Sequence, residues 1–122
     1  FGILISDVKD VARAHVLSIK NSKVNGRRLI IGSEVKKMLE LSKIMQEAFP
    51  KYAKKLPNKE MPIFMAKLIS YFDSSVRKLL PDLGILMQTD TSYSEDLLGM
   101  KFKPAKDSII DAGNSVIRLG LV

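Results

Sequence analysis

The sequence predicts an α/β fold in which a strand–helix–strand unit, residues 1–34, precedes a mostly helical region, residues 35–122. Apolar runs at 2–5 and 28–31 each have the length and composition of a short strand. Between them, at 7–19, apolar residues recur at steps of three and four, which is the period of an amphipathic helix. Beyond this unit the helical period returns several times, interrupted by prolines and glycines.

The order strand–helix–strand is typical of a crossover connection, which joins parallel strands. A parallel sheet is covered on both faces and contains more strands than this chain supplies. We therefore expect the strands at 2–5 and 28–31 to pair with protein outside this sequence or with a second copy of it. The chain begins at Phe1 and not at a methionine, which also favours a piece of a longer polypeptide.

The helix at 7–19 is predicted to pack on this sheet through one apolar face. That face consists of Val8, Val11, Ala12, His15 and Ile19. Asp7 can cap the N-terminus and Asp10 lies in the first turn, where free N–H groups and the helix dipole favour negative charge. His15 is the only histidine, and on this face we expect a buried, hydrogen-bonded residue and not a catalytic base.

The second region consists of helices with one short strand. The predicted helices are 36–49, 63–72, 76–80, 92–98 and 104–119, and the strand candidate lies near 85–88. Pro62 is suited to the first turn of its helix. Ser92 and Glu95 have the spacing of a capping box, and Gly99 is placed to end that helix. Gly113 lies within the last helix, which predicts a close approach of another element.

Composition limits the function. The chain of 122 residues has the length of one domain and carries a net charge of +7. The lysines are scattered and do not alternate with aromatic residues, so no nucleic-acid partner is expected. The sequence has no cysteine, which excludes disulfides and thiolate metal sites and is consistent with a cytoplasmic protein. No apolar run is long enough to cross a bilayer, so no membrane partner is expected.

Three segments resemble motifs of a known family in the order that the family has them. They are residues 6–15 (SDVKDVARAH), 39–52 (LELSKIMQEAFPKY) and 90–99 (DTSYSEDLLG). Together they resemble the C-terminal portion of extended short-chain dehydrogenases/reductases, in the NAD-dependent epimerase/dehydratase superfamily and its dihydroflavonol reductase-like branch. Two residues depart from the pattern: Tyr93 stands where lysine is usual, and Met100 where tryptophan is usual.

The resemblance implies a strand–helix–strand remnant of a Rossmann-type parallel sheet, followed by a helical substrate-binding lobe. It also implies a parent oxidoreductase that transfers hydride from NADP or NAD to a small hydrophobic carbonyl substrate, with a missing N-terminal nucleotide-binding half and a possible homodimer. The family's Tyr-x-x-x-Lys motif is absent, because Leu56, Ser75 and Leu97 lie four residues after the three tyrosines. No catalytic, cofactor-binding or metal residue is therefore expected in this segment, and alone it should bind no cofactor.

A substrate pocket wall is the one site predicted within the chain. It consists of Met61, Phe64, Met65 and Leu68, which form an apolar surface with adaptable methionines. The simpler explanation is an ordinary helical core. Two other functions stay open: a non-catalytic binding or assembly domain with the same fold, and a nucleotide-sugar epimerase or dehydratase.

Overall fold

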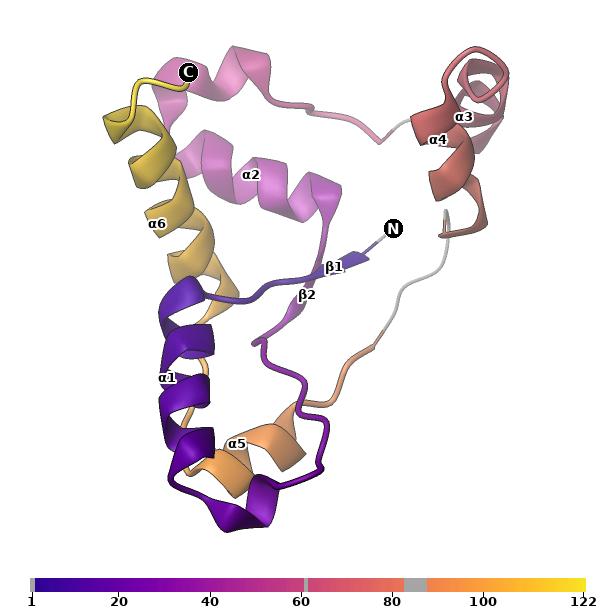
Figure 1. Cartoon of the computed structure of the whole chain (residues 1–122). Coiled ribbons are helices and arrows are strands. Elements are labelled where there is room, and N and C mark those ends of the chain that lie inside the picture. The colour runs from indigo at the N-terminus through magenta and orange to yellow at the C-terminus, as the bar shows by residue number, and fades with distance from the viewer. Residues whose placement is uncertain (1, 61, 83–87) are drawn as a thin grey trace.

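The structure, a computed structural model, describes residues 2–60, 62–82 and 88–122 (Figure 1). The strands are β1 (Gly2–Leu4) and β2 (Val35–Lys37); the α-helices are α1 (Val8–Ile19), α2 (Met38–Ala48), α3 (Ile63–Ile69), α4 (Ser74–Leu79), α5 (Ser92–Leu98) and α6 (Ala105–Arg118). Short 3-10 helices cover Ser22–Val24, Pro50–Lys55 and Leu80–Asp82. The α/β class predicted from the sequence is confirmed. The division at residue 34 stays a prediction, and β1 and β2 pair across it.

The sheet differs from the prediction in its second strand. β1 pairs with β2 in antiparallel register, with Gly2 opposite Lys37 and Leu4 opposite Val35. The expected strand at 28–31 is not assigned as a strand in the described part of the chain, so the prediction of a strand there is wrong. The antiparallel contact continues beyond the two strands, because the N–H of Ile5 donates to the carbonyl of Glu34 at 2.8 Å and the N–H of Ser33 donates to the carbonyl of Ile5 at 2.9 Å.

Side chains bind the backbone at 28–31 where a strand partner was expected. The N–H of Ile30 donates to Ser94 Oγ at 3.0 Å, and the hydroxyl of Ser6 donates to the carbonyl of Ile31 at 2.6 Å. These bonds satisfy polar groups that a ladder would otherwise use. The expectation that 2–5 and 28–31 pair with further protein stays a prediction.

Helix α1 buries a different face from the one predicted. Asp7 is its N-cap, as expected, and accepts from the N–H of Lys9 at 2.8 Å. Ala14 is buried, whereas Val8 is 78% exposed and Ile19 is 86% exposed. The helix has apolar residues on two sides, and its contact with α5 determines which side packs. We call the exposed stripe, made by Val8, Ala12, Val16 and Ile19, the open face of α1.

His15 lies on the exposed part of α1. Its Nδ1 is 2.7 Å from the carbonyl oxygen of Val11, one helical turn earlier. The expected buried position of His15 is therefore wrong, although the side chain does have a hydrogen-bond partner.

A small core joins α1 to α5. Its buried residues are Ala14, Val24, Leu98 and Met100, with Leu17, Leu29, Ile31, Leu97 and Phe102 packed around them. Gly99 ends α5 with a φ of +62°, as predicted. The predicted capping box does not form, because Thr91 is the N-cap and has no side-chain bond. Glu95 instead accepts from the N–H of Phe102 at 2.9 Å, which fixes the chain beyond the helix.

Helix α6 packs closely against the end of α2. A Cβ atom placed on Gly113 would lie 2.8 Å from Cζ of Phe49, a separation that a real side chain does not tolerate. The predicted close approach at Gly113 is confirmed, and the approaching group is an aromatic ring.

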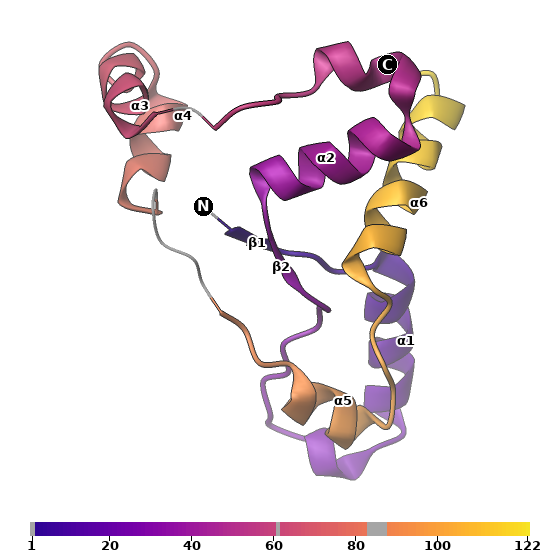
Figure 2. The ribbon, with the colours of Figure 1, turned by 180° about the vertical axis from the view of Figure 1, so that it is seen from behind.

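Helices α3 and α4 lie apart from the other helices in both views (Figures 1 and 2). Ala66 and Ser70 are buried, but Phe64 is 69% exposed and Leu68 is 60% exposed. The predicted helix 63–72 ends earlier, and Asp73 caps α4 by accepting from the N–H of Ser75 at 2.7 Å. Of the strand candidate near 85–88, residues 85–87 lie outside the described residues, and residue 88 is described but is not part of a strand. None of the helices in the described ranges has the length and apolar character that a bilayer crossing requires.

Candidate functional site

An apolar groove of about 450 Å³ lies between the end of β1, α2 and α6. Its lining residues are Leu4, Ile5, Ser6, Leu41, Met45, Phe49, Tyr52, Lys55, Leu56, Ser108, Ile109, Ala112, Gly113, Val116, Ile117 and Val122. A space of this size is within the range of cavities that hold small ligands.

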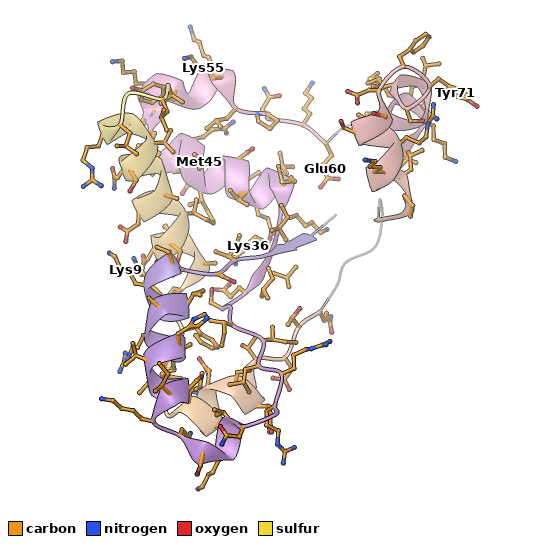
Figure 3. The ribbon with its side chains drawn as sticks, viewed as in Figure 1. Lys9, Lys36, Met45, Lys55, Glu60 and Tyr71 are labelled. Carbon is orange, nitrogen blue, oxygen red and sulfur yellow. The ribbon has the colours of Figure 1, made fainter. Side chains whose placement is uncertain are left out.

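The helical repeat sets the walls of the groove. Helix α2 and its C-cap contribute Leu41, Met45 and Phe49, which follow one another at four-residue steps and so share one face. Helix α6 contributes Ile109 and Val116 on the opposite wall, with Gly113 leaving room between them. Figure 3 shows Met45 on α2, with Lys55 on the turn that follows this helix. The groove is therefore built by two packed helices.

The polar groups of the groove are few and mostly engaged. The hydroxyl of Ser6 donates to the carbonyl of Ile31, and that of Ser108 donates to the carbonyl of Pro104 at 3.3 Å. Tyr52 and Lys55 lie at one end, where the ammonium of Lys55 is 5.8 Å from the centre of the Tyr52 ring. This lining, apolar apart from the two serines, Tyr52 and Lys55, suits an apolar group.

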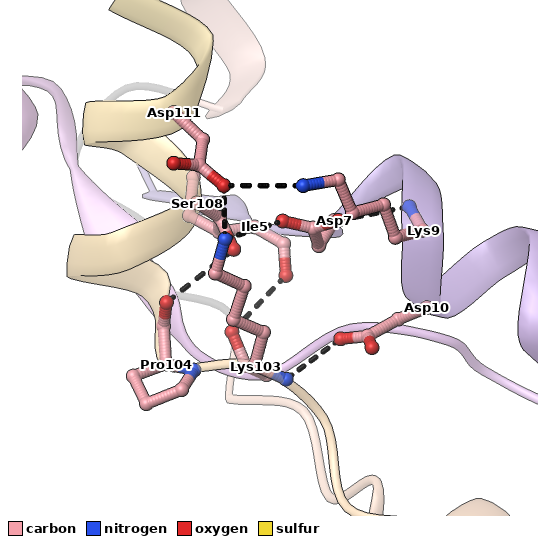
Figure 4. Close-up of polar contacts among 9 residues, drawn as sticks. Ile5, Asp7, Lys9, Asp10, Lys103, Pro104, Ser108 and Asp111 are labelled. Atoms are coloured by element: carbon pink, nitrogen blue, oxygen red, sulfur yellow. Dashed lines mark hydrogen bonds and ion pairs between the residues drawn. The ribbon is translucent and has the colours of Figure 1, made fainter.

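A polar junction ties the N-terminus of α1 to the segment around the start of α6 (Figure 4). The ammonium of Lys103 is 3.4 Å from a carboxylate oxygen of Asp7 and also contacts Asp111. Lys9 lies 3.6 Å from the same oxygen of Asp111. Asp10, in the first turn of α1, accepts from the N–H of Lys103 at 2.6 Å. We call Asp7, Lys9, Asp10, Lys103 and Asp111 the polar junction.

Asp7 is the buried member of the polar junction, with its side chain 6% exposed. The N–H of Lys9 holds the pKa of Asp7 below its usual value, helped by the hydroxyl of Ser108 and the ammonium of Lys103, while burial opposes them. Asp111 and then Asp7 raise the pKa of Lys103. Lys103 therefore favours the charged forms of Asp7 and Asp111, and they favour its own, whereas the charge of Asp7 opposes that of Asp111. The predicted cap at Asp7 is confirmed. Asp10 lies in the first turn of α1, as expected, and its carboxylate accepts from the N–H of Lys103, outside the helix.

A polar cavity of about 580 Å³ lies beside the junction. It is lined by Asp7, Lys9, Asp111 and Arg118, with serines and an asparagine between them. Within the described ranges, no group of three His, Cys, Asp or Glu side chains is placed to hold a metal ion. The carboxylates of Asp7 and Asp111 already form ion pairs with Lys9 and Lys103, so we assign the residues around this cavity a structural role.

The predicted pocket wall lies elsewhere. Phe64, Met65 and Leu68 are all exposed on α3, and none of them lines either cavity described above. Met61 lies outside the described residues. The groove has no counterpart among the predicted sites, although the steps 41, 45, 49 and 109, 112, 116 are visible in the sequence. Periodicity predicts an apolar face but does not show whether that face is filled.

Comparisons with known proteins relate the chain to reductases. No family model matches it. It is 27% identical over 117 residues to the NADPH-dependent methylglyoxal reductase GRE2 of Saccharomyces cerevisiae, an alignment that covers 92% of this chain and 28% of that protein. The chain thus spans less than a third of this relative.

Two solved structures share the fold. Gre2 of Candida albicans in complex with NADPH matches with a TM-score of 0.68 and 21% identity, over 97% of this chain and 30% of that one. Yeast methylglyoxal/isovaleraldehyde reductase Gre2 complexed with NADPH matches with a TM-score of 0.68 and 24% identity, over 100% and 35%. The chain therefore has the fold of the C-terminal part of a Rossmann-type reductase.

Proposed function

We propose that this chain is the C-terminal, substrate-side part of an NADPH-dependent reductase that transfers hydride to a carbonyl substrate. The observation that carries the proposal is the similarity to an NADPH-dependent methylglyoxal reductase along 92% of the chain. The motifs at 6–15, 39–52 and 90–99 support a dihydroflavonol reductase-like member of the superfamily. In this proposal the cofactor and the reacting atoms are held by protein beyond these residues.

The large exposed surface area of the chain supports a further protein partner. The chain exposes 9051 Å², whereas a folded monomer of this mass exposes about 6,600 Å². Large apolar side chains contribute to this surface: Val8 and Ile19 lie on the open face of α1, and Phe64 and Leu68 on α3. Exposed apolar surface of this extent marks a binding surface. We assign the open face of α1 to contact with the nucleotide-binding half.

Helix α3 is our candidate for the wall of the substrate pocket. Phe64, Met65 and Leu68 leave apolar atoms in water, and Tyr71, just beyond the helix, is 76% exposed. Figure 3 shows Tyr71 at the edge of the separate α3–α4 region. Adaptable apolar side chains suit a hydrophobic aldehyde or ketone. Met61, the remaining residue of the predicted wall, lies outside the described residues.

The test is an assay of the complete parent protein. With NADPH and either methylglyoxal or isovaleraldehyde, we expect the absorbance of NADPH to fall at a rate that depends on the concentrations of NADPH and of the added carbonyl compound. The chain 1–122 alone is the control and should neither reduce a carbonyl nor bind NADPH at micromolar concentration. A folded parent that consumes no NADPH with any aldehyde or ketone overturns the proposal, and so does tight NADPH binding by 1–122.

A further inference from the structure

We infer that the apolar groove between α2 and α6 binds a third helix, which is amphipathic and belongs to the nucleotide-binding half of the same polypeptide. The inference rests on the proposed function, because it requires protein beyond residues 1–122. The relatives provide room for such a helix, since the chain corresponds to 28% of the GRE2 length and to 30–35% of the two solved reductases.

The shape of the groove favours a helix. Two of its walls are helices, and the side chains at Leu41, Met45 and Phe49 repeat at four-residue steps over about 12 Å of α2. Ridges of this kind accept the ridges of another helix between them. A partner with apolar residues at i, i+3 or i+4, and i+7 presents side chains at the matching spacing.

The chemistry of the groove argues against a carbonyl substrate as its occupant. A site for a small polar molecule needs polar groups that converge on it. Here the hydroxyls of Ser6 and Ser108 are directed to backbone carbonyls of the chain itself. Met45, Val116 and Ile117 are half-buried, which leaves apolar atoms in water that a helix face can cover.

Charge indicates how the helix is oriented. Among the described lining residues, Lys55 carries the only charged side chain, and Lys51 and Lys54 belong to the same turn. The ammonium of Lys51 is 5.7 Å from the Tyr52 ring, so the basic groups gather at this end of the groove. We therefore expect an acidic residue, or the C-terminal end of the helix dipole, at the end nearest Lys55.

The experiment uses the complete parent protein with its methionines replaced by photo-methionine. Met45 lines the groove, whereas Met38, two turns earlier on α2, is 49% exposed and outside the lining. On irradiation, Met45 should cross-link to one peptide of the nucleotide-binding half with apolar residues at helical spacing. Met38 is the internal control and should not link to that peptide.

Three outcomes overturn the inference. Cross-links from Met45 only to residues 1–122 of the same copy mean that the groove has no further occupant. Links between isotopically heavy and light copies identify a second molecule as the occupant. Loss of the cross-link on adding isovaleraldehyde identifies the groove as a substrate site.

A pair of substitutions tests the same contact without cross-linking. Met45→Glu should lower the melting temperature of the parent by several degrees, because a helix face then meets a carboxylate, while Met38→Glu should leave it nearly unchanged. Equal melting temperatures for the two variants contradict the inference. A parent that lacks reductase activity but gives the Met45 cross-link refutes the proposed function and leaves the helix in place.

Discussion

The polar junction and helix α3 differ in how their side chains are satisfied. At the junction, Asp7 is buried and has hydrogen-bond and ionic partners from both α1 and the segment before α6. On α3, Phe64 and Leu68 are apolar and face water. The first region is complete within this chain, whereas the second leaves its apolar surface uncovered. Residues whose side chains are satisfied within the chain therefore hold the fold, whereas residues whose apolar surface stays uncovered are available for a partner or substrate.

The largest expected effect comes from Gly113→Ala, at the tight contact between α6 and the Phe49 ring. In a helix alanine is normally about 1 kcal/mol more favourable than glycine. Here the new methyl group meets the Phe49 ring, and overpacking of this kind destabilises by about 1–3 kcal/mol. Urea denaturation measures the difference. The control is the exposed neighbour, Asn114→Ala, which should be neutral or slightly stabilising; equal behaviour of the two variants contradicts the close packing.

The next effect separates capping from charge at Asp7. Asp7→Ala removes the acceptor for the N–H of Lys9 and should destabilise the chain by about 1–2 kcal/mol. Asp7→Asn keeps a capping oxygen and should retain part of that stability. The midpoint of chemical denaturation orders the three proteins as wild type, Asn and Ala. If Asn and Ala are equally destabilised, the carboxylate charge and not the cap is the stabilising feature.

Acid should weaken the junction in a defined direction. The folded-state pKa of Asp7 is lowered, so its carboxylate stabilises the fold fully above the unfolded pKa of about 3.9, and this stabilisation is lost as pH falls through the folded pKa. Stability measured from pH 7 to pH 2 should fall below about pH 4. The fall should be shallower in Asp7→Asn. A profile of Asp7→Asn that superimposes on the wild type removes Asp7 from the acid response.

The smallest expected effect lies on the open side of the comparison. Phe64→Ser and Leu68→Ser remove apolar atoms that already face water, so each should change stability by less than about 0.5 kcal/mol. In the parent enzyme the same changes should lower kcat/KM for a hydrophobic aldehyde. Ala66→Leu is the matched control on the buried side of α3 and should destabilise the helix. Large destabilisation by Phe64→Ser indicates that α3 is packed against the chain.

Much of the fold could be predicted from local chemistry. The cap at Asp7, the helix end at Gly99 and the tight contact at Gly113 each follow from what one residue type can do at one position. The second strand could not be predicted, because Val35–Lys37 is too short to show a period and lies beside a strong helical pattern. The buried face of α1 was misassigned because only tertiary contacts choose between two apolar sides.

The candidate site was harder to predict than the fold. The apolar residues of α3 were noticed, but the groove was not, because its lining comes from β1, α2 and α6 together. The bond from Lys103 to Asp10 likewise joins residues that are 93 positions apart, which no local pattern can indicate.

That long separation has a consequence for how the chain is made. A contact between residues so distant in sequence closes a large loop, which carries an entropic penalty and slows folding. On the ribosome, α1 is synthesised early, and the contacts that Asp7 and Asp10 make with Lys103 form only after that residue has emerged. We therefore expect α1 to reach its final packing only after the segment around the start of α6 has been synthesised, so that the two ends of the chain complete their folding together.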